Sequence, residues 1–231
     1  MNTRTGCVFA FATILAIAIA LHFAQRIAAC EGDAEAEKSV KALGGMVGRS
    51  VEIHGMPIVS VSYIRTKVKD ADLKDLAGLK NLRTLALNGT NVGDKGLKEV
   101  ATLPSLHALY LNGTKVTDAG LAELAGLKNL ERLVLADTKV TDAGLRELAG
   151  LKTLRGVGLS NTEVTDTGMK QLAVLANLSQ LNLDGTKITD VGLKELTALK
   201  GLQILNLGRT KVTDAGVAKL QMALPKCFIR H

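Results

Sequence analysis

The sequence predicts an α/β solenoid, in which strand–turn–helix units stack so that their strands form one parallel sheet and their short helices a second layer. Two observations predict it: a 24-residue repeat runs without a gap through residues 79–222, and each unit changes its hydrophobic period halfway along. One such unit cannot bury its apolar edge alone, whereas stacked units share a continuous core. The chain has 231 residues and is 47% apolar, which is enough to form a substantial hydrophobic core and excludes a disordered chain.

The repeat has a strict register. Its six regular units begin at Leu79, Leu103, Leu127, Leu151, Leu175 and Leu199. Their consensus is LxxLxxLxLxxTxVTDxGLxxLAx, whose positions we number 1 to 24. A seventh, degenerate unit covers residues 55–78, so seven repeats are predicted over residues 55–222.

Each unit contains the signals for a strand, a turn and a short helix. Apolar residues at positions 7 and 9, such as Leu109 and Leu111, alternate as in a strand with one buried face. A Thr-Asp pair at positions 15 and 16 then precedes Gly-Leu-x-x-Leu, where the apolar spacing becomes three, and we expect this pair to cap a helix. Between them, position 12 is threonine in all seven units: Thr66, Thr90, Thr114, Thr138, Thr162, Thr186 and Thr210.

The segments that flank the repeats have the features of caps. The N-terminal cap is predicted over residues 31–54 and the C-terminal cap over 223–231. Residues 33–43 favour a helix, and residues 46–53 can pair as a strand with 58–63. These elements would cover the first edge of the apolar core.

The pattern resembles the leucine-rich repeat over 168 of the 231 residues, with threonine at position 12 where that family usually has Asn or Cys. We expect the threonine hydroxyl to satisfy backbone groups of the turn, as the family's residue does. The TxVTDxGLxxL half is most similar to repeats of exported bacterial proteins. It is more distantly similar to repeats of F-box adaptors, but a ubiquitin-ligase adaptor is disfavoured because the chain has no room for an F-box. The resemblance implies a horseshoe arc with the parallel sheet on its concave side.

The resemblance also implies that the concave face binds another protein. Its exposed positions would be 5, 6, 8 and 10 of each unit. In the middle units these positions include one large aromatic side chain, one apolar side chain and several basic side chains. Such a composition is typical of a modest protein-binding centre, and the alternative is a strand surface without a partner. The candidate partner-binding residues are His107, Tyr110, Arg132, Val134 and Arg155.

A lysine column at position 13 offers a second candidate surface. Its members are Lys67, Lys115, Lys139, Lys187 and Lys211, and Asn91 and Glu163 interrupt it. Successive strands lie about 4.8 Å apart, so these charges would line one rim and could hold an anionic glycan or lipid. The alternative is a solvated rim that keeps this edge soluble.

Residues 1–30 predict an extracytoplasmic location, in the cell envelope, in the periplasm or as a secreted protein. The apolar run 7–24 is followed by small residues, as in an export signal. Its 18 residues also reach the lower limit for a membrane anchor. Residues 27–30 resemble a bacterial lipobox, in which Cys30 would be lipidated. The cleaved, lipidated and anchored forms, and hence attachment to a membrane, stay open.

The cysteines do not form a disulfide framework, although export would place the chain in an oxidising compartment. Cys7 lies in the signal and Cys30 at its end. Cys227 falls on a core leucine position of the C-terminal cap, where we expect a small buried hydrophobe rather than a reactive thiol.

No motif predicts catalysis, a cofactor or a metal site, so we expect a protein that is not an enzyme. The four histidines have no partner at metal-ligand spacing, and there is no phosphate-binding loop or nucleophile elbow. The net charge is +7, but the sequence has no Lys/Arg run, and aromatic residues make up only 3%. Both observations argue against nucleic-acid binding. An aspartate at position 16 of every unit is interpreted as helix capping rather than calcium binding: Asp70, Asp94, Asp118, Asp142, Asp166, Asp190 and Asp214.

Overall fold

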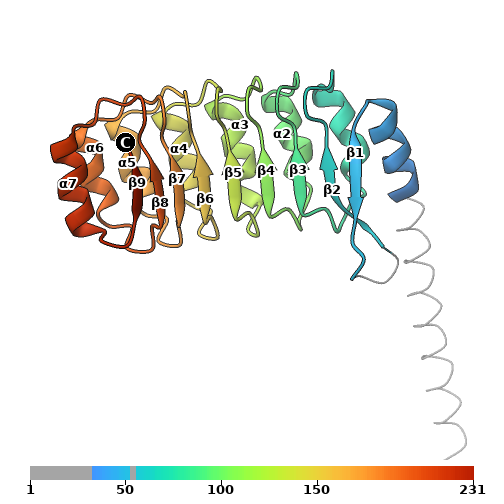
Figure 1. Cartoon of the computed structure of the whole chain (residues 1–231). Coiled ribbons are helices and arrows are strands. Elements are labelled where there is room, and N and C mark those ends of the chain that lie inside the picture. Colours follow the sequence, from blue (N-terminus) through green and yellow to red (C-terminus); the bar gives the residue numbers. More distant parts are fainter. Residues whose placement is uncertain (1–32, 53–55) are drawn as a thin grey trace, which may run out of the picture.

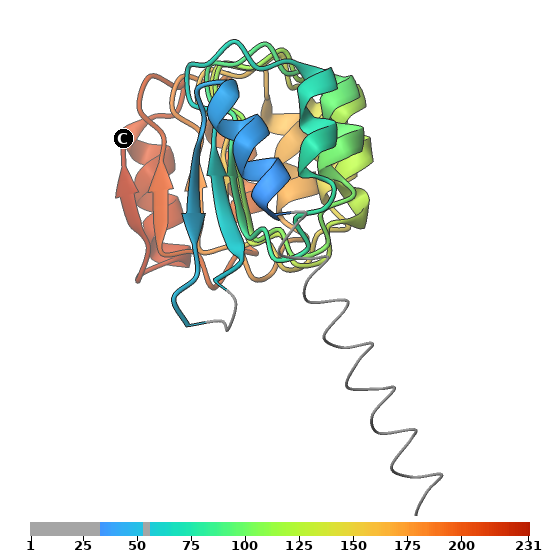
Figure 2. The same cartoon turned by 90° about the vertical axis from the view of Figure 1, so that its right-hand side faces the viewer.

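The computed structural model describes residues 33–52 and 56–231. It contains a nine-stranded sheet whose strands lie side by side in chain order (Figure 1). The helices of the repeats form a row behind one face of this sheet, as the view along the solenoid in Figure 2 shows. The predicted α/β solenoid is therefore confirmed. Residues 1–30, with the candidate signal and Cys30, lie outside the described part of the chain.

The regular elements are short and recur once per unit. The strands are β1 (Met46–Arg49), β2 (Ile58–Ser62), β3 (Thr84–Ala86), β4 (Ala108–Tyr110), β5 (Arg132–Val134), β6 (Gly156–Gly158), β7 (Gln180–Asn182), β8 (Ile204–Asn206) and β9 (Phe228–Arg230). The repeat helices are η1 (Asp70–Leu76), α2 (Asp94–Val100), α3 (Asp118–Glu123) with η2 (Leu124–Gly126), α4 (Asp142–Leu148), α5 (Asp166–Leu172), α6 (Asp190–Leu196) and α7 (Asp214–Ala223). Only the first pair in this sheet, β1 and β2, is antiparallel; the other pairs are parallel.

The core is one continuous column of aliphatic side chains between the sheet and the helices. Parallel pairing brings the residues at position 7 into register, as in Leu109 opposite Leu133. The position-7 residues of the six regular units are all at most 3% exposed: Leu85, Leu109, Leu133, Val157, Leu181 and Leu205. Burying one such side chain stabilises the fold by about 1.5–3 kcal/mol, so each unit is stabilised mainly by the neighbours that cover it.

A tight turn follows each strand at positions 11 and 12. The residue at position 11 has a positive φ, between 55° and 70°, in every unit: Arg65, Gly89, Gly113, Asp137, Asn161, Gly185 and Arg209. Glycine and asparagine adopt this conformation most easily. The threonine at position 12 then donates its hydroxyl to the carbonyl at position 9, as Thr138 does to Leu135 at 2.6 Å. This confirms that the threonine satisfies the turn backbone.

The aspartates at position 16 begin the helices, but the carboxylates of the first six bond to the next repeat. The interpretation that they cap their own helix was therefore incomplete. Oδ1 of Asp118 accepts the backbone N–H of Thr141 at 2.8 Å, and Oδ2 accepts its hydroxyl at 2.6 Å. The side-chain cap of α4 comes instead from Thr141, whose hydroxyl oxygen accepts the N–H of Ala143 at 3.2 Å. Position 16 therefore links successive repeats.

The glycine at position 18 is explained by the same contact. A Cβ atom on Gly144 would overlap Oδ1 of Asp118 in the preceding repeat. Gly120, Gly168 and Gly192 stand in the same relation to the aspartates before them. Asp at position 16 and Gly at position 18 are thus one packing device at the junction between units.

The N-terminal cap consists of a helix over residues 33–42 and strand β1. Oδ2 of Asp33 accepts the backbone N–H of Ile58 at 2.8 Å, which ties the helix to the first repeat strand. Glu37 of the same helix binds Arg49 of β1 and Lys41, with nitrogen–oxygen distances of 2.5 and 2.7 Å.

At the other end, Cys227 precedes β9 and is 4% exposed, as expected for a core position, and its burial raises the pKa of the thiol. Among the described residues, no helix has the length and apolar character needed to cross a membrane.

Candidate functional site

The sheet face away from the helices, which we call the concave face, carries two columns of outward side chains. They stand at positions 6 and 8, because these flank the buried residue at position 7. The position-6 column is Thr84, Ala108, Arg132, Gly156, Gln180, Ile204 and Phe228. The position-8 column is Ala86, Tyr110, Val134, Gly158, Asn182, Asn206 and Arg230.

The structure places the five predicted partner-binding residues on or just before three successive strands. Tyr110 and Val134 are register partners on β4 and β5, and Arg132 lies on β5 in the other column. His107 precedes β4 and is partly buried, with Nδ1 2.6 Å from the carbonyl oxygen of Ser105. Arg155 precedes β6.

Arg155 is paired on the concave face itself. Its Nε lies 3.8 Å from the carboxylate of Glu131, and both side chains are about half or more exposed. Arg132 has no ion pair or hydrogen bond with its guanidinium among the residues that the structure describes. Of the two bases, Arg132 is therefore the one available to a ligand.

A hollow of about 210 Å³ opens on the concave face over β5 to β8, beyond the predicted centre. Its floor passes over β6, where glycines at both outward positions leave the strand without side chains. Tyr110 and His107 do not line it. The outward side chains around it are Arg132, Val134, Gln180, Asn182, Ile204 and Asn206.

The side chain of Val134 partly covers the neighbouring strand β6, whose two outward positions are glycine. A Cβ atom on Gly158 would lie 2.7 Å from Cγ1 of Val134, so this side chain occupies the space that a residue at 158 would need. Arg132 lies similarly beside Gly156, where a Cβ atom would be 3.6 Å from its Cζ. The two glycines thus allow side chains of β5 to lean along the sheet.

The sequence reasoning missed the far wall of this hollow, which Gln180, Asn182 and Asn206 form with Ile204. A signal was present, because only the unit 151–174 among the regular repeats has glycine at both positions 6 and 8. The amides in the following units then occupy the same two columns.

A second hollow, of about 480 Å³, adjoins the first near the C-terminal ends of the last strands and shares Asn182 and Asn206 with it. Asp184, Arg209, Arg230 and His231 line its other side, together with Gly208. The two adjoining hollows together extend from β5 to β9, and we call the pair the C-terminal groove.

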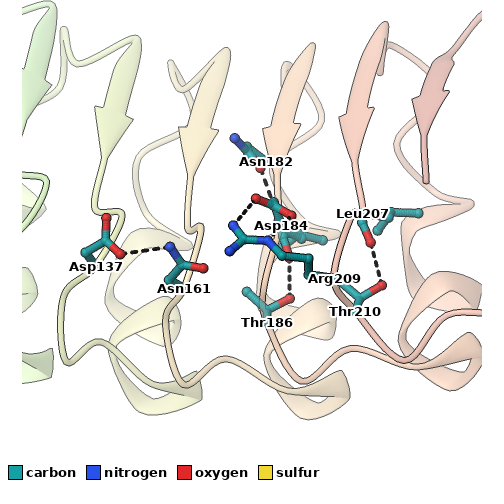
Figure 3. Close-up of polar contacts among 9 residues, drawn as sticks. Asp137, Asn161, Asn182, Asp184, Thr186, Leu207, Arg209 and Thr210 are labelled. Carbon is teal, nitrogen blue, oxygen red and sulfur yellow. Dashed lines mark hydrogen bonds and ion pairs between the residues drawn. The ribbon is translucent and has the colours of Figure 1, made fainter.

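The negative charge of Asp184 is compensated by an arginine within this groove. Figure 3 shows its carboxylate facing Arg209, which donates from Nε at 3.2 Å and from Nη2. These hydrogen bonds hold the pKa of Asp184 below its usual value. Oδ1 of Asn182 accepts the backbone N–H of Asp184 at 3.1 Å, and this leaves the amide nitrogen of Asn182 for other contacts.

The lysines at position 13 lie along one edge of the solenoid, as predicted, and all five are exposed. Isolated bridges join Lys115, Lys139 and Lys211 to the preceding repeats, so the row is regular. Lys187 lies 3.9 Å from the carboxylate of Glu163. The other four form no ion pair with any described residue.

A second lysine column, at position 2, was missed by the sequence reasoning and has a structural role. Nζ of Lys80 donates to the carbonyl of Ala77 at 3.1 Å, and Nζ of Lys128 donates to that of Ala125 at 2.6 Å. These carbonyls lie at helix C-terminal ends, where cations are favourable. In the described ranges no group of three or more His, Cys, Asp or Glu residues is placed to hold a metal ion.

The repeats match the family model of the leucine-rich repeat over residues 78–101, 102–125, 126–149, 174–196 and 202–220. Together with the fold, these matches show that the chain is a leucine-rich-repeat protein. The unit that carries Gly156 and Gly158 lies outside the matched ranges, and its β6 and α5 nevertheless continue the solenoid. No curated protein matches the sequence.

Solved structures with a similar fold include two internalins of Listeria monocytogenes. The internalin InlF is 21% identical with a TM-score of 0.59, over 76% of this chain and 54% of its own. Internalin C2 is 26% identical with a TM-score of 0.57, over 75% of this chain and 80% of its own. A leucine-rich-repeat protein of Leptospira interrogans is 23% identical with a TM-score of 0.51, over 68% and 45%. This chain thus spans about half of the InlF structure.

Proposed function

We propose that this chain is an exported, non-enzymatic module that binds another protein through its concave face. The observation that carries the proposal is the pair of outward columns at positions 6 and 8, which the row of helices leaves uncovered and which enclose the C-terminal groove. Leucine-rich-repeat proteins are generally binding modules without catalytic activity, which supports the same assignment. The apolar run and small residues within 1–30 support export.

Tyr110, Val134 and Arg132 form the centre of the proposed surface, with His107 and Arg155 at its margin. Tyr110 is partly exposed next to Val134 and can bury a large, rigid ring at small entropic cost. Arg132 supplies several donors in a planar fork. Rings and arginines of this kind contribute most of the affinity of many interfaces.

Site-specific photo-crosslinking tests the proposal. A benzophenone amino acid replaces Tyr110 on the concave face or, as the matched control, Val191, which is 61% exposed on α6. We expect a discrete protein adduct from the first position in the native envelope and none from the second. Tyr110→Ala should weaken binding of that protein by more than about 1 kcal/mol. Adducts from Val191 alone would contradict the proposal.

A second candidate is an envelope-associated structural protein or lipoprotein that binds an anionic glycan or lipid through the Lys rim. The observation that favours it is that Lys67, Lys115, Lys139 and Lys211 have no carboxylate partner among the described residues, although the lysines at position 2 are engaged. Binding through this rim would disappear at about 0.5 M salt, where screening is strong, and would weaken in Lys115→Ala with Lys139→Ala. Loss of binding in Tyr110→Ala, with the rim double variant unchanged, would exclude this candidate.

A further inference from the structure

We infer that the C-terminal groove binds an extended acidic segment of the partner, with Arg132 and Arg230 holding carboxylates at its two ends and side-chain amides contacting its backbone between them. This inference rests on the proposed function, because it names the chemistry of the partner at the same face.

The charges that line the groove favour an acidic ligand. The side chains of its lining include three arginines, Arg132, Arg209 and Arg230, and one acidic residue, Asp184. Arg209 pairs with Asp184, and neither of the other two guanidiniums has a carboxylate partner within the described chain. A guanidinium binds a carboxylate through two parallel hydrogen bonds, so two such positions are open at opposite ends of the groove.

Arg132 is held in a suitable place by the glycine strand beside it. Because Gly156 has no side chain, the guanidinium of Arg132 lies along the sheet, with its Cζ 3.6 Å from where a Cβ of residue 156 would be. The guanidinium of Arg132 therefore borders the first hollow, close to the strand that forms its floor.

The floor between the two arginines suits a polypeptide backbone. Gln180, Asn182 and Asn206 line it, and their carboxamides can donate to and accept from peptide groups. Ile204 and Phe228 lie in the same column and are 40% and 68% exposed, which adds apolar contact for side chains of the ligand. Among the described residues, no Phe, Tyr or Trp side chain lines either hollow, so stacking on a sugar is disfavoured.

The spacing of the two arginines sets the length of the segment. Arg132 is on β5 and Arg230 on β9, four strand intervals apart, which corresponds to about 19 Å across the sheet. An extended chain rises about 3.3 Å per residue. Two acidic residues about six positions apart would therefore reach both arginines at once.

Fluorescence polarisation with defined peptides tests the inference on the full-length chain at low salt. The probe is fluorescein-labelled Glu-Ser-Thr-Ser-Thr-Ser-Glu, and the control peptides replace both glutamates by glutamine or place them side by side. We expect saturable binding of the probe and affinities at least about fivefold weaker for both controls, as loss of one charged contact implies.

Charge-neutralising variants locate the binding. Arg132→Gln and Arg230→Gln should each weaken binding of the probe by about fivefold, whereas Lys139→Gln on the Lys rim, which removes the same charge, should not. Unchanged thermal unfolding of these surface variants would show that they are folded.

Three results would overturn the inference: no binding of the probe, equal binding of the glutamine peptide, or an equal loss in Lys139→Gln. If a protein were still crosslinked from position 110 while the probe failed to bind, the proposed function would stand and only the acidic segment would be rejected. If neither assay gave a signal, both would be rejected.

Discussion

Asp118 and Thr141, which belong to successive repeats, are joined by two hydrogen bonds: the carboxylate of Asp118 accepts both the backbone N–H and the hydroxyl of Thr141, at 2.8 and 2.6 Å. The same double contact recurs in the pairs Asp94–Thr117, Asp142–Thr165, Asp166–Thr189 and Asp190–Thr213. In a solenoid each unit contacts only its neighbours, so contacts of this kind contribute directly to the energy of the junctions between units.

Asp118→Ala should lower the free energy of unfolding by about 1–3 kcal/mol, because it leaves the partly buried N–H of Thr141 without its acceptor. Urea unfolding measures the change. The matched control is Asp214→Ala at the same repeat position, where the carboxylate is fully exposed and its described contact is with His231 at 3.3 Å. Equal losses in the two variants would mean that the contact between repeats does not stabilise the fold.

Gly144→Ala should also destabilise the protein, by about 1–3 kcal/mol, because the added methyl group displaces the Asp118 carboxylate from the junction. Gly150→Ala in the same unit is the control, since a Cβ there meets no atom within 4 Å. We expect the control to be neutral or slightly stabilising. The midpoints of thermal unfolding compare the two, and a neutral Gly144→Ala would refute the packing role of position 18.

Leu133→Ala should lower the free energy of unfolding by about 2–5 kcal/mol through the cavity that it leaves in the core. The neighbouring Val134 points to the opposite face of the sheet and is only partly buried, so Val134→Ala should cost much less. A loss below about 1 kcal/mol for Leu133→Ala in chemical denaturation would contradict its burial.

The N-terminal cap should lose stability in acid. Hydrogen bonds from Lys41 and then Arg49 lower the pKa of Glu37 from 4.5 to about 2. A carboxyl whose pKa is depressed by folding contributes its stabilisation above the unfolded pKa and loses it as the pH falls toward the folded pKa. The difference in urea midpoint between the wild type and Glu37→Gln should therefore shrink between pH 5 and pH 2. A constant difference would show that the ionised carboxylate does not matter.

The variant Cys30→Ser tests whether the chain is exported as a lipoprotein. If residues 27–30 form a lipobox, the variant should lose incorporation of a labelled fatty acid, which mass spectrometry of the N-terminal peptide of the wild type would locate on Cys30. Membrane retention that persists in the unlabelled variant would indicate an uncleaved anchor instead.

The centre of the candidate site could be derived from the sequence, but the hollow beside it and the pairing of its charges could not. The register of the repeat correctly brings Tyr110 beside Val134 and places Arg132 on the same face. It does not reveal that Arg155 pairs with Glu131, because both residues are at position 5, and the pairing depends on how their side chains turn. Nor does it show a hollow beyond Val134, which arises where two glycines and the side chains leaning over them meet.

By itself, the sequence determined the solenoid, the unit length and the buried columns, because a strict 24-residue period leaves only one way to align the apolar positions in stacked units. The tertiary structure alone decided where the carboxylates at position 16 bond. A Thr-Asp pair at a helix start suits a cap within the unit or a contact with the next unit equally well, and the residue types are the same in both cases. The stacking distance places the next threonine within hydrogen-bond range of each carboxylate, and it also brings Arg132 and Arg230, 98 residues apart, onto one groove.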